Sequence, residues 1–156
     1  MNTDQTTTLG IDLGSRHVKL CLMRDGAIEK TAVHDTIQFY REYGYVSENG
    51  FTVDIRALGF DGADRVSATG YGRMGAALTG AENISELTAH FRGACHQSGL
   101  GTFTLLDLGG QDYKVISARD GRMTDMATTD KFAASTGRYL EKMSRVIDIS
   151  LDERGT

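Results

Sequence analysis

The chain has 156 residues, a formal net charge of −4 at pH 7 and a pI of about 5.5. This length suits one ordinary domain or two small halves. The acidic balance argues against nucleic-acid binding, which needs a basic surface. No apolar run is long enough to span a bilayer, and residues 1–8 lack the basic and apolar regions of a signal peptide. We therefore expect a cytoplasmic protein that contacts no membrane.

The first hundred residues predict a β-rich segment that ends in a helix. Apolar residues at helical spacing predict this helix over about Ile84–His96, with Asn83 and Glu86 as a capping box. The stretch Tyr45–Gly62 has no clear period and is expected to be irregular, apart from a short helix near Asp54–Leu58. The other expected elements are strands over Leu9–Leu13, Val18–Arg24, Ala27–His34 and Arg65–Thr69, and one short helix over Ile37–Tyr43.

Glycines at positions 99 and 101 break the chain, so we expect a lobe boundary between residues 1–100 and residues 101–156. The second part predicts three further strands. It then predicts a final helix over about Phe132–Ile147, capped by Thr129 or Asp130. The three strands are Phe103–Leu108, Tyr113–Ala118 and Arg122–Thr128.

The two parts share a repeat at an offset of 95 positions (107 − 12), because Asp12-Leu13-Gly14 returns as Asp107-Leu108-Gly109. Asp-Gly between apolar runs predicts a type I′ hairpin turn, in which both central residues have positive φ. Each copy therefore predicts a three-stranded antiparallel meander with a glycine turn and one carboxylate after its first strand. Further identities at this offset are Lys19 with Lys114, Arg24-Asp25-Gly26 with Arg119-Asp120-Gly121, Ala32 with Ala127, and Asp35 with Asp130.

Two glycine-rich turns with one carboxylate each indicate a site for the phosphates and Mg²⁺ of a nucleotide. Mg²⁺ favours one or two carboxylates plus phosphate oxygens, so Asp12 and Asp107 are the expected metal and catalytic residues. The alternative is that each aspartate only closes a turn. The expected phosphate contacts are Gly14, Ser15, Gly109 and Gly110.

Five further side chains each have a functional and a structural interpretation. Gln111 is a candidate to orient a water for attack on a γ-phosphate, and otherwise is a surface turn residue. Lys19 and Lys114 are interpreted as solvated hairpin lysines, with phosphate contact as the alternative. Glu86 stands one helical turn before His90, a spacing that suits a metal pair or an acid–base pair. Capping of the helix already explains Glu86, however, and no further metal ligand is evident.

Five blocks of sequence, in order over about residues 8–150, are GIDLGS at 10–15, ATGYGR at 68–73, ISELTAH at 84–90, LDLGGQDYKVI at 106–116 and DKFAASTGRYL at 130–140. They resemble the BadF/BadG/BcrA/BcrD-type ATPases, the activases of 2-hydroxyacyl-CoA dehydratases and benzoyl-CoA reductases. The resemblance implies an α/β fold with an RNase H-like, actin-like ATPase lobe, followed by a partial second lobe with the same meander. It also implies Mg-ATP clamped between the lobes, whose hydrolysis drives an electron from an iron–sulfur cluster into a partner enzyme.

The chain departs from this family in two ways. In the family, the segment that corresponds to residues 130–140 begins Asp-Lys-Cys, and its cysteine ligates a cluster shared by two subunits. This chain has Phe132 at the position of that cysteine, and a phenyl ring offers iron no ligand. Cys21 and Cys95 lie outside the matching positions, so we expect no iron–sulfur cluster. The chain also ends before the family's second cluster cysteine and adenosine-binding turn. Mg-ATP binding by this chain alone is therefore expected to be weak.

Three functions remain. The first is an activase-like ATPase that is partner-dependent or vestigial, favoured by intact Asp12, Asp107 and Gln111. The second is a non-catalytic binding or regulatory module, favoured by Phe132. The third is a split sugar- or acetate-kinase-like protein, which has the same phosphate turns. The expected assembly is a homodimer, or a hetero-complex with a dehydratase-like or reductase-like protein or a completing subunit.

Overall fold

The computed structural model describes residues 6–48, 50–60, 62–70, 72, 80–109 and 113–128. The chain divides into two compact units, Met1–Ala89 and His90–Thr156, each of which is described by itself. This division falls inside the helix α2 (Glu86–Ser98), and the lobe boundary expected after residue 100 stays a prediction. The other elements are β1 Thr7–Leu13, β2 His17–Arg24, β3 Ala27–Asp35, α1 Thr36–Tyr43, β4 Gly44–Ser47, β5 Gly50–Val53, β6 Arg65–Thr69, β7 Ala81–Asn83, β8 Phe103–Leu108, β9 Tyr113–Arg119 and β10 Arg122–Thr128.

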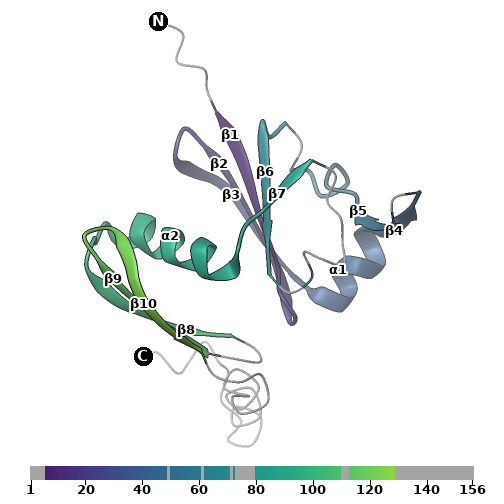
Figure 1. Ribbon diagram of the computed structural model, residues 1–156. Helices are drawn as coiled ribbons and strands as arrows, with labels where there is room; N and C mark the ends of the chain where they lie inside the picture. The colour runs from purple at the N-terminus through teal and green to yellow at the C-terminus, as the bar shows by residue number, and fades with distance from the viewer. Residues whose placement is uncertain are drawn as a thin grey trace, which may run out of the picture. The chain divides into compact units, whose positions relative to one another are not determined.

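The first unit contains a five-stranded sheet in the order β3-β2-β1-β6-β7 (Figure 1). Strands β1, β2 and β3 are an antiparallel meander, whereas β6 pairs parallel to β1 and β7 pairs parallel to β6. The four strands that the sequence predicts for this sheet are confirmed, and the α/β fold is confirmed with them. The carboxyl ends of β1 and β6 lie side by side, because Asp12 pairs with Thr69 in the parallel ladder.

The core of the first unit follows from strand periodicity. Successive side chains of a strand point to opposite faces, so alternate apolar residues of β1 and β2 are buried together. Phe39 of α1 joins them, and Asp35 starts this helix because its Oδ1 accepts hydrogen bonds from the backbone N–H groups of Ile37 (2.9 Å) and Gln38 (3.1 Å). The buried apolar residues are Leu9, Ile11, Leu13, Val18, Leu20, Leu22, Phe39, Val53, Phe60 and Ala68.

Two expectations for the segment between α1 and β6 are wrong. Residues 44–53 are not irregular, since β4 and β5 pair as an antiparallel hairpin. Each strand has only four residues, too few to show a period. No helix is assigned to residues 54–58; instead the backbone N–H of Leu58 donates to Ile55 (3.2 Å) and that of Gly59 donates to Arg56 (3.0 Å), which are hydrogen-bonded turns.

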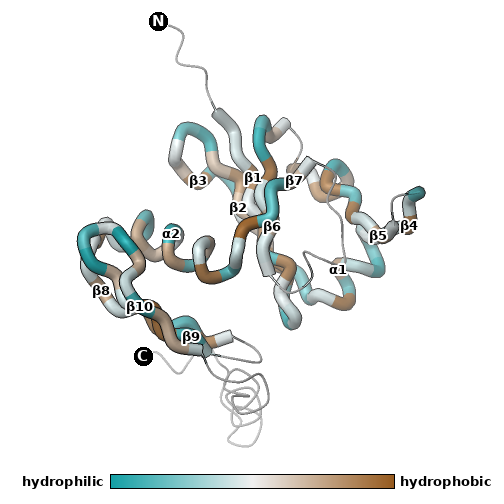
Figure 2. Tube along the Cα trace, viewed as in Figure 1, coloured by the Kyte–Doolittle hydropathy of each residue, from teal (hydrophilic) through white to brown (hydrophobic). Residues whose placement is uncertain are grey.

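Helix α2 is confirmed with a different cap. Asn83 ends β7, and Ser85 caps the helix, because its Oγ accepts a hydrogen bond from the backbone N–H of Thr88 (3.1 Å). Polar and apolar stretches alternate along α2 in Figure 2, as expected for an amphipathic helix. In the second unit, the ring of Phe91 from this helix stacks at 6.1 Å on Phe103 of β8.

The second unit repeats the meander of the first as a three-stranded sheet, β10-β9-β8. Its register is the same: Asp107 faces Lys114 as Asp12 faces Lys19. A β-bulge recurs at the same place in both meanders. Each third strand shifts register by one residue, at Glu29 in β3 and at Thr124 in β10, and these positions are again 95 apart (124 − 29).

The hairpin turns of the two meanders are confirmed as positive-φ Asp-Gly pairs. Asp25 and Gly26 have φ of 52° and 80°, and Asp120 and Gly121 have φ of 50° and 70°. These values are those of a type I′ turn, the turn that matches the twist of a hairpin. The expected final helix, Phe132–Ile147, lies outside the described residues. Among the residues that are described, no helix is long and apolar enough to cross a membrane.

Replacing Gly121 by alanine should destabilise the second unit by about 1–2 kcal/mol, because an L side chain disfavours positive φ. Steric crowding contributes nothing, since no heavy atom of the described chain lies within 4 Å of the added Cβ. Gly93→Ala in α2 is the matched control, and should instead stabilise by about 0.5–1 kcal/mol through helix propensity. Urea unfolding measures both changes, and shifts of the same sign would contradict the assigned turn.

Candidate functional site

Asp12 lies next to the last residue of β1, directly opposite Lys19 of β2. The Nζ of Lys19 is 3.1 Å from Oδ2 of Asp12. The lysine side chain is 59% exposed, as the sequence predicts, whereas that of Asp12 is 19% exposed. An exposed pair of this kind contributes at most about 1 kcal/mol. Its importance is that it places a carboxylate and an ammonium group together at the end of a strand.

Glycines surround the end of β1 and leave no room for side chains. At Gly14, an added Cβ would lie 2.5 Å from the carbonyl oxygen of His17. At Gly70, which has φ +87°, it would lie 2.6 Å from Oδ1 of Asp12 and 2.7 Å from the carbonyl oxygen of Leu13. Backbone alone can therefore occupy the space around the Asp12 carboxylate at these positions. Ser15, which follows Gly14, is exposed.

In the second unit, the matching carboxylate of Asp107 faces a buried lysine. Lys114 is only 6% exposed, so its interpretation as a solvated lysine is wrong. It lies on the same face of β9 as buried Ile116 and Ala118, and its Nζ is 3.6 Å from Oδ2 of Asp107. A buried ammonium group needs such a partner, because an unpaired buried charge is strongly destabilising.

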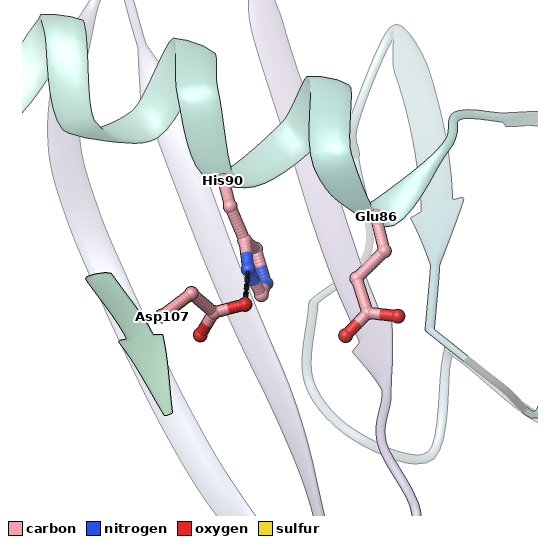
Figure 3. A group of neighbouring side chains, drawn as sticks. All are labelled: Glu86, His90 and Asp107. Carbon is pink, nitrogen blue, oxygen red and sulfur yellow. Dashed lines mark hydrogen bonds and ion pairs between the residues drawn. The ribbon is translucent and has the colours of Figure 1, made fainter. Parts of the chain in front are cut away.

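His90 of α2 is hydrogen-bonded to Asp107 (Figure 3). Its Nδ1 is 2.6 Å from Oδ2 of Asp107, so the imidazole N–H donates to the carboxylate. This hydrogen bond is the main cause that lowers the pKa of Asp107 below its usual value. Burial acts in the opposite direction, and the charges of His90 and Lys114 lower the pKa further. Asp107 is thereby kept as a carboxylate, the form that can bind a cation.

Glu86 precedes His90 by one turn of α2 (Figure 3). One ligand atom each of Glu86, His90 and Asp107 lies within 4.8 Å of the others. Asp107 is thus the third candidate ligand, which the sequence alone does not reveal for the Glu86–His90 pair. Periodicity alone could not show it, because Asp107 reaches His90 through the packing of β8 on α2.

The remaining expected site residues divide into two groups. Gly109 follows β8 and is half-buried, whereas Gly110 and Gln111 lie outside the described residues.

Cys21 and Cys95 are both half-buried free thiols. Burial raises the pKa of Cys21, which disfavours the thiolate form that iron requires.

Comparison with known proteins identifies the family of this chain. Residues 9–156 match the family model described as the BadF/BadG/BcrA/BcrD ATPase family. The chain belongs to this family.

Two curated relatives and one solved structure of this ATPase family illustrate the match. The chain is 34% identical over 151 residues to the (R)-2-hydroxyglutaryl-CoA dehydratase activating ATPase of Acidaminococcus fermentans, covering 94% of this chain and 55% of the relative. It is 35% identical over 159 residues to the 2-hydroxyisocaproyl-CoA dehydratase activator of Clostridioides difficile, covering 96% and 55%. The crystal structure of component A of the Acidaminococcus fermentans dehydratase aligns with a TM-score of 0.67 at 30% identity, covering 93% and 55%. This chain of the BadF/BadG/BcrA/BcrD family thus spans about half the length of these relatives.

The lowered pKa of Asp107 predicts a pH dependence of stability in this family member. Its carboxylate stabilises the folded second unit above the ordinary aspartate pKa of about 3.9, and this contribution is lost as the pH falls through the lower folded-state pKa. The urea concentration at the unfolding midpoint should therefore decrease as the pH is lowered from about 5 to about 2. Asp107→Asn should make this decrease smaller. NMR signals of β9 report this unit directly. Identical pH profiles for both proteins would contradict the assigned hydrogen bond.

Proposed function

We propose that the chain is the phosphate- and magnesium-binding part of an activase-type ATPase, and that it depends on a further polypeptide for full activity. The observation that carries this proposal is the duplicated Asp–Lys pair. Asp12 with Lys19, and Asp107 with Lys114, occupy the same register of two meanders in a member of an ATPase family. The two meanders, which are offset by 95 positions, share their strand register, the position of a β-bulge and a charge pair, and chance does not explain this combination.

The residues of the first unit fit a magnesium nucleotide. Asp12 supplies the oxygen ligand that Mg²⁺ prefers. Gly14 and Gly70 exclude side chains from its surroundings, so backbone can approach a phosphate group. Lys19 supplies a positive charge beside the carboxylate. Bound Mg²⁺ would neutralise phosphate charge there.

In the second unit, Asp107 is the proposed partner of Asp12 in holding the metal, with Gly109 and Gly110 as phosphate contacts. His90 and Lys114 fix the position and charge of Asp107. Gln111 is proposed to orient the attacking water. We propose that one nucleotide uses both carboxylates, because hydrolysis of a phosphoanhydride is catalysed mainly by positioning and by compensation of charge.

The proposed partner is a dehydratase-like or reductase-like enzyme. Two of the relatives are named as an activating ATPase and an activator of 2-hydroxyacyl-CoA dehydratases, and a further relative from Thauera aromatica is named as a part of benzoyl-CoA reductase. A homodimer, or a hetero-complex with a completing subunit, is the assembly that we propose.

A regulatory or binding module is the second candidate, favoured by Phe132. Where family members carry a cluster cysteine, this residue offers no iron ligand. Such a protein would dock on the same enzymes without passing an electron. A split kinase is less well supported, because the family match names ATPases.

Alanine at Asp12 or at Asp107 should abolish magnesium-dependent nucleotide binding, since each removes a proposed metal ligand. The parent chain should bind Mg-ATP with a dissociation constant of about a millimolar, or roughly 4 kcal/mol. Calorimetric titration with Mg-ATP and Mg-ADP measures this, and Asp125→Ala in exposed β10 is the control. Micromolar binding that survives both aspartate substitutions would place the ligand elsewhere.

The chain should contain no stoichiometric iron when purified without oxygen, because Phe132 removes the thiolate of the family segment. Elemental analysis and the visible spectrum measure this directly. Phe132→Cys in the same preparation is the companion variant. Stoichiometric iron in the parent chain would show that Cys21 or Cys95 binds it and would contradict our interpretation of both thiols.

A further inference from the structure

Thr69 carries the buried side-chain hydroxyl that is left without a hydrogen-bond partner in the described part of the chain. The residue is 8% exposed and ends β6. Buried polar groups in proteins are almost always paired, since a buried hydroxyl that has lost its water hydrogen bonds is destabilising. An unpaired buried hydroxyl of this kind calls for a partner outside the described part of the chain.

The position of Thr69 indicates what that partner is. In the parallel ladder Thr69 pairs with Asp12, so the two side chains lie on the same face of the sheet, on strands about 4.8 Å apart. On the other side of Asp12, Lys19 faces it across the antiparallel ladder at 3.1 Å. A hydroxyl, a carboxylate and an ammonium group thus form one row across β6, β1 and β2.

The row also stands at the carboxyl end of two parallel strands, where α/β sheets bind their ligands. Gly70 follows Thr69 with φ +87°, and any Cβ at this position would lie 2.6 Å from Oδ1 of Asp12. The chain therefore cannot place a side chain of its own at position 70 over the Asp12 carboxylate.

We infer that Thr69 is a binding residue for the magnesium–phosphate group of the nucleotide, and that its hydroxyl hydrogen-bonds this group beside Asp12. The inference rests on the proposed function and adds a residue from a third strand to it. A hydroxyl suits this ligand, because it can accept a hydrogen bond from a metal-bound water or donate one to a phosphate oxygen.

A purely structural threonine would behave differently when its hydroxyl is removed. If the hydroxyl were paired within the protein, Thr69→Val would lower the melting temperature of the ligand-free chain. Because it is unpaired, the same change should leave that melting temperature unchanged or raise it. The loss should appear only when the ligand is present.

The test compares the parent chain with Thr69→Val, which keeps the shape, and Thr69→Ser, which keeps the hydroxyl. Titration of ¹⁵N-labelled protein with Mg-ADP, followed by NMR, measures affinities in the millimolar range. Thr69→Val should bind about tenfold more weakly, which is about 1.4 kcal/mol, and Thr69→Ser should bind nearly as well as the parent. The control is Ser67→Ala, since Ser67 lies on the same face of β6 two residues earlier, opposite Gly10.

Two failures of this experiment are distinguishable. Parent-like affinity of Thr69→Val, or a lowered melting temperature of this variant without ligand, would overturn the role of Thr69 and leave the proposed function intact. Absence of Mg-ADP binding by the parent chain would contradict the proposed function and the role of Thr69 together. A parallel titration with Mn²⁺ alone separates binding of the metal from binding of the phosphate. If Thr69→Val also binds Mn²⁺ more weakly than the parent chain, the hydroxyl contacts the metal or a metal-bound water.

Discussion

A carboxylate held opposite a lysine, where the first strand of a meander ends, is the constraint on which the rest depends. The Asp-Gly turn with two positive φ angles sets the register of each hairpin. That register places Asp12 opposite Lys19 and Asp107 opposite Lys114. A slip of one residue would turn each aspartate to the other face of the sheet. The local turn chemistry therefore determines whether the proposed site can exist.

The two copies share a backbone but place the pair in different surroundings. In the first unit, Asp12 lies on the face opposite to the buried residues of β1, and Lys19 is exposed. In the second unit, Lys114 lies on the buried face of β9, and His90 of α2 donates to Asp107. The same residue types thus pair with an exposed lysine in one copy, and with a buried lysine and a histidine in the other. A duplicated site can diverge in this way without any change in its charged residues.

Local signals predict most of the fold from the sequence, and long-range packing accounts for what the sequence misses. The repeat and its Asp-Gly turns predict both meanders, because hairpin turns depend on adjacent residues. The β4–β5 hairpin escapes prediction because its strands have only four residues. Burial of Lys114 could have been inferred from its alternation with Ile116 and Ala118. The contact of His90 with Asp107 and the unpaired hydroxyl of Thr69 are visible only in the three-dimensional structure, since both depend on packing between separate elements.

The central claim is that the turns after β1 and β8 serve the metal of one nucleotide. Paramagnetic broadening by Mn-ADP tests it most directly, because Mn²⁺ replaces Mg²⁺ and broadens only NMR signals near the bound ion. The account predicts that the backbone signals of Gly14 and Gly109 broaden together, at the same Mn-ADP concentration, and that Gly93 in α2 and Gly121 at the far hairpin turn stay sharp. Broadening near only one of the two turns, or strongest broadening away from both, would contradict it.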